Sequence, residues 1–177
     1  MSNDPFARMP DLPSFSLTSS DIEDGKPLAK VHYSGLFGVP GGEDRSPQLS
    51  WSGAPADTQG YVVMAYDPDA PTLAGFWHWA VADIPGSVGE LASGAGDLSG
   101  SNLPAGAFQL RNDAGSARFI GAAPPPGHGP HRYYFVVHAI DVASLKVPKD
   151  ATPTLLAFNV FSHALGRAVL MATGEQP

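Results

Sequence analysis

The sequence predicts a mainly β protein, in which an antiparallel sheet or sandwich carries one helix near the C-terminus. Three observations support this fold class. Short segments alternate apolar and polar residues, only one stretch repeats apolar residues at helical spacing, and the strands precede that stretch. Repeated strand–helix–strand units would need helices between the strands, so a parallel sheet is not expected. Glycine and proline, 20 and 18 of 177 residues, place much of the chain in turns.

Strand-like segments follow one another along the first 141 residues. We expect strands at 15–18, 28–33, 46–51, 61–66, 76–84 and 131–141, with short islands at 108–110 and 118–120. Segment 28–33 would place Ala29, Val31 and Tyr33 on one face. Segment 61–66 is apolar throughout, which is typical of a strand covered on both faces.

Simple alternation assigns the faces of the two longest strands. In segment 76–84 one face would hold Phe76, His78, Ala80, Ala82 and Ile84, and the other Trp77, Trp79, Val81 and Asp83. In segment 131–141 His131 and Tyr133 share a face, and Arg132 takes the other. His78 and His131 thus belong to two different predicted strands.

Between these strands, residues 85–130 hold 16 of the 38 glycines and prolines and form one long connection. A connection of this length is uncommon unless it serves a site, so it is a first functional pointer. The helix is expected to begin after Thr152, a suitable N-cap, with Pro153 at its first position. Its apolar residues recur up to Gly174, at Leu155, Phe158, Phe161, Leu165, Ala168 and Val169.

Length and composition exclude several classes of protein. The length favours a single domain over residues 1–177, with residues 1–12 irregular. The absence of cysteine excludes disulfides, zinc sites with cysteine ligands, iron–sulfur clusters and thiol catalysis. A formal net charge of −7 argues against binding to a nucleic acid backbone. Without a leader-like or membrane-spanning segment, the expected location is the cytoplasm.

Four polar residues stand at or within the predicted strands: Asp67, Asp69, His78 and His131. Sequence motifs for a serine hydrolase elbow, a phosphate-binding loop, a dinucleotide fold or a zinc protease are absent. A histidine among aromatic residues stays neutral on burial unless a carboxylate compensates its charge. Two imidazoles, with backbone N–H groups from 127–129, would suit a small anion such as phosphate.

Each of these residues also has a purely structural interpretation. The run Asp-Pro-Asp-Ala-Pro (67–71) is typical of a turn whose aspartates bond their own backbone, and His78 could be an ordinary buried strand histidine. Carboxylates repel phosphate, so the presence of Asp67 and Asp69 beside an anion site requires an explanation. Either they hold the histidines as hydrogen-bond acceptors, or one of them meets a cationic group on the same ligand.

Taken in series, the motifs resemble the phosphatidylethanolamine-binding protein (PEBP) family. The series consists of S-P-x-L-x-W (46–51), D-P-D-A-P (67–71), F-W-H-W-A-V-A-D-I-P (76–85) and P-P-P-G-H-G-P-H-R-Y-Y-F (124–135). The likeness covers about residues 17–170 and is to the bacterial branch, also called Raf-kinase-inhibitor-like. It implies a PEBP-like fold, with a large central antiparallel sheet, a second smaller sheet and a C-terminal helix.

The resemblance also implies a small cavity for phosphate-like anions and the headgroup of phosphatidylethanolamine. Its lining residues here would be Asp67, Asp69, Pro71, His78, Gly129, His131 and Tyr133. Arg132 matches the motif but faces away from His131, so a structural or ion-pairing role is expected for it. Eukaryotic members carry a further C-terminal segment at the cavity mouth, so here the mouth is expected to be more open or closed by another subunit.

Three functions stay open at this point. The first is non-catalytic binding of a phosphorylated small molecule or phospholipid headgroup, which could modulate a kinase or other signalling partner. The second is a hydrolase that uses the same Asp/His cluster with a metal or by acid–base catalysis. The third is a kinase or protease inhibitor that acts through its surface. The first hypothesis needs no cofactor or metal and no stable membrane anchor, and the bacterial branch makes a homodimer plausible.

Overall fold

The computed structural model describes residues 4–177, and a five-stranded antiparallel sheet forms its centre. The strand order is β6 (Phe108–Gln109), β4 (Phe76–Pro85), β3 (Gly60–Asp67), β7 (His131–Ile140) and β8 (Ala164–Gly174). A smaller antiparallel sheet has the order β1 (Ser16–Thr18), β2 (Leu49–Ser52) and β5 (Glu90–Leu91). The prediction of two antiparallel sheets and one helix is confirmed.

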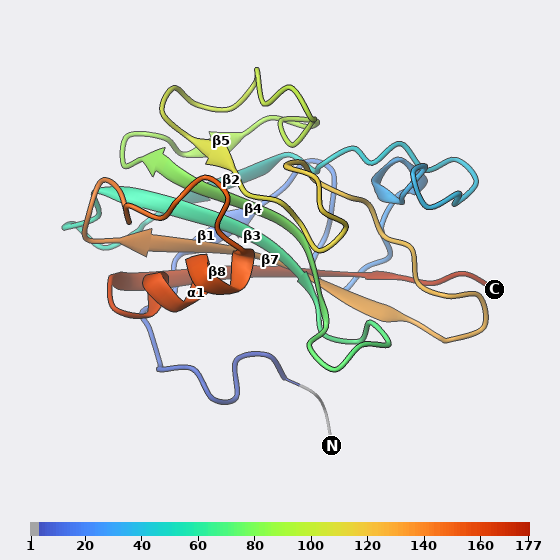
Figure 1. Ribbon diagram of the computed structural model, residues 1–177. Helices are drawn as coiled ribbons and strands as arrows, with labels where there is room; N and C mark the ends of the chain where they lie inside the picture. Colours follow the sequence, from blue (N-terminus) through green and yellow to red (C-terminus); the bar gives the residue numbers. More distant parts are fainter. Residues whose placement is uncertain (1–3) are drawn as a thin grey trace.

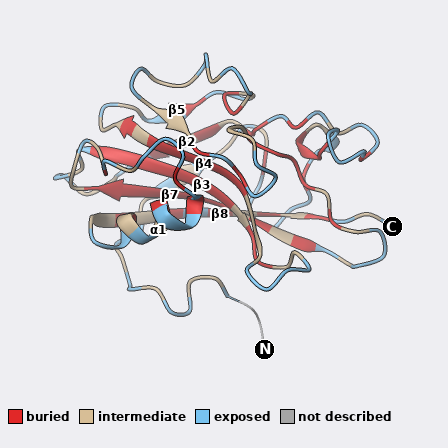
Figure 2. Ribbon diagram, viewed as in Figure 1, coloured by how far each residue is buried: buried red, intermediate tan, exposed pale blue. Residues whose placement is uncertain are grey.

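The two faces of the central sheet carry separate hydrophobic cores. On one face Val63, Val81 and Val137 pack with the small sheet through Leu49 and Trp51. The other face packs against α1 (Pro153–Phe161), which lies in front of the central sheet in Figure 1. Because both faces are covered, the middle strands are buried along most of their length, as the red ribbons in Figure 2 show.

The predicted long C-terminal helix is wrong in its second half. Thr152 caps α1 by accepting a hydrogen bond from the N–H of Leu155, but the helix ends at Phe161. The chain then returns as β8, which pairs with the whole length of β7. The buried residues of β8 alternate and are mostly small: Gly166, Ala168, Leu170, Ala172 and Gly174. Strand pairing therefore overrides a sequence pattern that also fits a helix.

The expected strand at 28–33 is a turn with the short 3-10 helix η1 (Lys30–His32). His32 is buried there, and its Nδ1–H is satisfied by the carbonyl oxygen of Arg45 at 2.7 Å. The island at 118–120 is irregular, while β5 is a short strand that the sequence did not indicate. The remaining strands lie within a few residues of their predicted positions.

Residues 4–12 contain neither helix nor strand, and residues 1–3 of the predicted irregular segment lie outside the described residues. The single-domain organisation stays a prediction. Among residues 4–177, no helix has the length and apolar character needed to cross a membrane.

Candidate functional site

Asp67 ends β3 and fixes the turn that follows it. Its Oδ1 accepts hydrogen bonds from the N–H groups of Asp69 and Ala70, at 2.7 and 3.0 Å. This is the self-bonded aspartate turn expected from the sequence. Its Oδ2 lies 2.7 Å from Nδ1 of His131, and both side chains are almost fully buried. Asp67 therefore holds the imidazole of His131 in place.

His131 opens β7 and bonds through both ring nitrogens. Nδ1–H donates to the carboxylate of Asp67. Nε2 lies 2.7 Å from Nδ1 of His128, so the two imidazoles share a hydrogen bond. The loop can curl back in this way because Gly127 and Gly129 adopt φ values of +72° and +89°. Asp67, His131 and His128 thus form one hydrogen-bonded chain.

His78 lies in a β-bulge of β4. The pairing joins Trp79 to Ala65 and Trp77 to Tyr66, which leaves His78 as the extra residue. Nδ1–H of His78 donates to the carbonyl of Ile120 at 2.8 Å. Burial lowers the pKa of His78, so the ring is neutral and its Nε2 is an acceptor.

This bulge corrects the predicted faces of β4. Trp77, Ala80 and Ala82 pack on the side of α1, whereas Trp79 and Val81 pack on the side of the small sheet. His78 lies on that second side, in a cavity that Tyr133 also lines. Strict alternation therefore fails, because the extra residue shifts the faces by one position. A second register shift, opposite Tyr61–Val63, places Ile84 on the side of the small sheet, not with Ala80 and Ala82 as predicted.

Tyr133 follows His131 on the same face of β7, as predicted. Its ring centroid lies 5.2 Å from that of His78 in an edge-on arrangement. A Cβ on Gly174 would come within 2.8 Å of the Tyr133 ring, so glycine leaves room for it. The hydroxyl is buried, its O–H has no acceptor of normal geometry among residues 4–177, and the backbone N–H of Ala123 interacts with its oxygen. Burial, with the charge of Asp67, raises the pKa of Tyr133 and keeps the hydroxyl protonated.

These side chains surround a cavity of about 180 Å³. It is lined by Phe37, Asp67, Ala70, Pro71, Thr72, Phe76, His78, Ala123, Pro125, His131 and Tyr133. Beside the lining residues Phe37 and Thr72, the side chains of Leu36 and Leu73 are exposed to solvent. The site thus combines a few polar side chains inside the cavity with apolar side chains around its opening.

Of the seven predicted ligand residues, Asp67, Pro71, His78, His131 and Tyr133 line this cavity, whereas Asp69 and Gly129 do not. Asp69 instead binds Arg132 through both oxygens, at 2.7 Å to Nη2 and 2.7 Å to Nε. These bonds lower the pKa of Asp69. The ion-pairing role expected of Arg132 is therefore present.

Two details of the predicted anion site are wrong or incomplete. The N–H groups of Gly127 and His128 donate to the carbonyls of Gln176 and Pro125, so they do not face an anion. The His128 side chain had no assigned role, although its position three residues before His131, between two glycines, was an available signal. Within residues 4–177, no three His, Asp or Glu side chains are arranged to hold a metal ion.

Sequence comparison places the chain among known proteins. A sequence profile described as phosphatidylethanolamine-binding protein matches residues 18–175. The UPF0098 protein YbcL of Escherichia coli (strain K12) is 41% identical over 162 residues, which cover 92% of this chain and 88% of YbcL. The chain belongs to the phosphatidylethanolamine-binding protein family. The UPF0098 protein YbhB of the same strain is 41% identical over 156 residues, covering 88% of this chain and 97% of YbhB.

Solved PEBP structures share the fold. The crystal structure of E. coli YbcL, called a new member of the mammalian PEBP family, matches with a TM-score of 0.89 at 39% identity and covers 93% of this chain and 99% of YbcL. The putative PEBP homolog CT736 of Chlamydia trachomatis matches with a TM-score of 0.76 at 29% identity, covering 93% and 99% of the two chains. The predicted family is confirmed. Membership supports a binding protein in general.

Proposed function

We propose that this protein binds, without catalysis, the phosphate group of a phosphorylated small molecule or of a phosphatidylethanolamine-type headgroup. The site is the cavity lined by Asp67, Pro71, His78, His131 and Tyr133. The observation that carries the proposal is the buried Tyr133 hydroxyl, whose O–H has no acceptor of normal geometry among residues 4–177 and which lies beside two imidazoles. The backbone N–H of Ala123 interacts with its oxygen, so the O–H proton is the group that a ligand oxygen would satisfy.

The polar groups have distinct roles, which differ between a phosphate monoester and the diester of a lipid headgroup. The Tyr133 hydroxyl donates to a phosphate oxygen of either ligand. Nε2 of the neutral His78 accepts the P–OH proton of a singly ionised monoester, a contact that a diester does not offer. His131 donates through Nε2 once it carries a second proton, and Asp67 balances the resulting charge. This last contact requires His128 to turn away, because it bonds the same nitrogen.

The size of the cavity favours a headgroup over a whole lipid. A cavity of about 180 Å³ suits phosphoethanolamine but is too small for acyl chains. Because Asp69 is bonded to Arg132, the aromatic faces of Phe37 and Phe76 are the better partners for a ligand ammonium group. The exposed side chains of Leu36 and Leu73 suit the apolar part of a lipid that stays outside.

A titration tests the binding site. Protein labelled with ¹⁵N-histidine is titrated with inorganic phosphate and, separately, with phosphoethanolamine. We expect saturable shifts at His78 and His131, which disappear in His131→Ala. The matched control His163→Ala removes a histidine in the turn before β8, paired with Asp141, and should retain the response. Unchanged binding in His131→Ala would refute the assignment.

The same experiment distinguishes the sources of the phosphate. Tighter binding of phosphoethanolamine than of inorganic phosphate supports recognition of the ammonium group. Tighter binding still to phosphatidylethanolamine dispersed in phosphatidylcholine bicelles supports a lipid ligand. Release of inorganic phosphate or ethanolamine during these incubations would instead support the hydrolase alternative.

Four further expectations rest only on the family resemblance. They are control of a kinase or other signalling partner, protease inhibition through the surface, a homodimer and a cytoplasmic location. We infer that any such control is coupled to the cavity. Pulldown with His131→Ala and light scattering at micromolar concentration test the partner and the dimer.

A further inference from the structure

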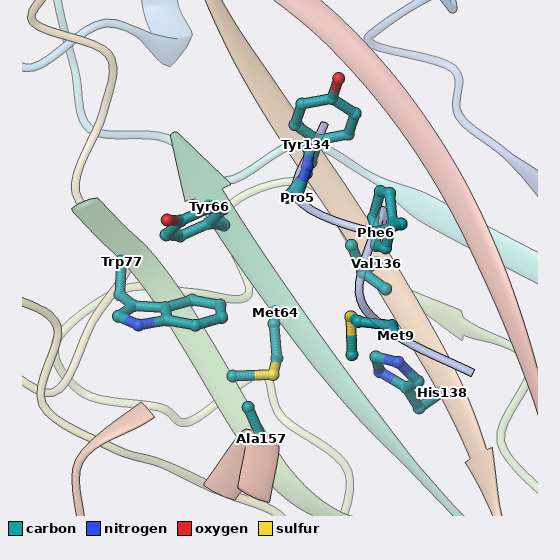
Figure 3. A pocket seen from close by; sticks show the side chains of 10 residues that line it. All are labelled: Pro5, Phe6, Met9, Met64, Tyr66, Trp77, Tyr134, Val136, His138 and Ala157. Carbon is teal, nitrogen blue, oxygen red and sulfur yellow. The ribbon is translucent and has the colours of Figure 1, made fainter. Parts of the chain in front are cut away.

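A second cavity, of about 240 Å³, lies on the opposite face of the central sheet. Met64 and Tyr66 of β3, Trp77 of β4 and Val136 of β7 form its floor (Figure 3). Phe6 and Met9 of the N-terminal segment and Ala157 of α1 also line it. These residues point away from the candidate phosphate site, because neighbours such as Ala65 and Tyr133 pack on the other face. The two cavities are therefore separate.

The polar groups of Trp77 and Tyr66 are already satisfied. Nε1–H of Trp77 donates to Oγ1 of Thr154 at 3.1 Å, and the hydroxyl of Tyr66 donates to the carbonyl of Ala74 at 2.8 Å. Neither atom needs a ligand. His138, which also lines the cavity, differs from them.

His138 is 5% exposed and is bonded through only one ring nitrogen in residues 4–177. Its Nε2 accepts a hydrogen bond from Nε–H of Arg167 on β8, at 3.2 Å. Because burial and the charge of Arg167 lower the pKa of His138, the ring is neutral, and Nδ1 carries the proton. The N–H of Nδ1 is buried and has no acceptor among residues 4–177, and the ring that carries it lines this apolar cavity.

We propose that this cavity binds a small uncharged aromatic molecule that carries one carbonyl oxygen, which accepts the hydrogen bond of Nδ1–H of His138. The rings of Trp77 and Phe6 and the sulfur of Met64 favour an aromatic body. The volume of about 240 Å³ suits a small molecule with a single aromatic ring. An ionised group would lose its hydration against these walls, and the nearby Arg167 guanidinium is already placed over the Phe6 ring and bonded to His138, so the ligand is neutral.

The N-terminal segment gives the ligand a way in. Pro5, Phe6 and Met9 cover the cavity, and this part of the chain contains neither helix nor strand. Phe6 contacts the ring of Tyr134 edge-on, at 5.6 Å between centroids. Displacing one covering turn leaves the paired strands intact, so entry does not require the sheet to open.

Two isosteric probes test the proposal in the full chain. Acetophenone offers a carbonyl oxygen, whereas α-methylstyrene replaces that oxygen with a CH₂ group of similar shape. We expect acetophenone to cause saturable shifts at the methyl groups of Met64 and Met9 and at the His138 ring. α-Methylstyrene should bind about tenfold more weakly, because it leaves the Nδ1 donor unpaired. Equal affinities, or no saturable shift with acetophenone, would overturn the proposal.

Variants separate this cavity from the phosphate site. Ala157→Leu fills the cavity from α1 and should abolish acetophenone binding, whereas Ala105→Leu, at an exposed position, should not. His138→Leu should bring the two probes to the same affinity, which checks the hydrogen bond even if Ala157→Leu fails to fold. His131→Ala should leave acetophenone binding unchanged. Retained binding in a folded Ala157→Leu, or a persistent tenfold preference in His138→Leu, would contradict the proposal.

Discussion

Replacing Tyr133 by phenylalanine should weaken phosphate binding and stabilise the free protein at the same time. The ring stays between His78 and His131, and only the hydroxyl is lost. A hydrogen bond to a charged acceptor contributes about 1.5–3 kcal/mol, so the affinity for phosphoethanolamine should fall by about 10- to 150-fold. In the free protein the hydroxyl is buried without a partner of normal geometry. Its removal should therefore raise the free energy of unfolding by about 1 kcal/mol, or the melting temperature by about 2–4 °C.

Calorimetric titration with phosphoethanolamine and urea denaturation without ligand measure the two effects of Tyr133→Phe. Tyr134→Phe is the matched control, because Tyr134 faces the other side of β7 and lines the other cavity. It should leave the phosphoethanolamine affinity unchanged. An affinity of Tyr133→Phe within twofold of wild type would refute the role of the hydroxyl. A loss of stability would show that the hydroxyl already has a partner in the free protein.

Three further predictions concern the histidines. Asp67→Asn removes the carboxylate that orients His131 and balances its charge, so phosphate affinity in the same titration should fall at least about tenfold; an unchanged affinity would contradict this role. His128→Ala removes the competitor for Nε2 of His131 and should tighten phosphate binding about fivefold, whereas weaker binding would mean that His128 contacts the ligand. Burial lowers the pKa of His138 to about 3, from a value near 6.5 in the unfolded chain. Between these two pH values only the unfolded chain protonates this histidine, so the free energy of unfolding falls as the pH falls. From about pH 7 to about pH 4.5, wild type should lose about 2.5 kcal/mol more than His138→Leu in urea denaturation; parallel losses would contradict the shifted pKa.

The strands that the sequence predicted best are those with the strongest local signals. The apolar run at 61–66 and the long alternation from His131 correspond to β3 and β7. β8 was missed because its buried residues, such as Gly166 and Ala168, are small and give little contrast with the exposed positions. Its strand conformation depends on pairing with β7, a contact that local sequence does not express.

Motif spacing located the polar residues of the candidate site but not all of their partners. The turn at 67–71 contains two aspartates, and only the structure shows that Asp67 holds His131 while Asp69 binds Arg132. The bulge at His78 also escaped prediction, because one inserted residue leaves the composition of β4 unchanged. The contact between His128 and His131 depends on positive φ values at the neighbouring glycines. Glycine adopts positive and negative φ equally well, so the sequence alone does not show which one the loop uses.

The resolved partners also bear on the two explanations that were left open for the aspartates. Both carboxylates accept hydrogen bonds from this chain: Asp67 from His131 and its own turn, and Asp69 from Arg132. For Asp67 the geometry matches the explanation in which a carboxylate holds a histidine, whereas Asp69 holds an arginine, which neither explanation included. An anion can then be captured locally by donors, although the protein carries a formal net charge of −7.

The central claim is tested most directly by a crystal structure determined with saturating phosphoethanolamine. We predict electron density for the phosphate group within hydrogen-bond distance of the Tyr133 hydroxyl and Nε2 of His78. The ring of His128 should have turned away from His131, whose Nε2 then faces the phosphate. An empty cavity with His128 still bonded to His131, or a phosphate bound elsewhere on the protein, would contradict the proposed function.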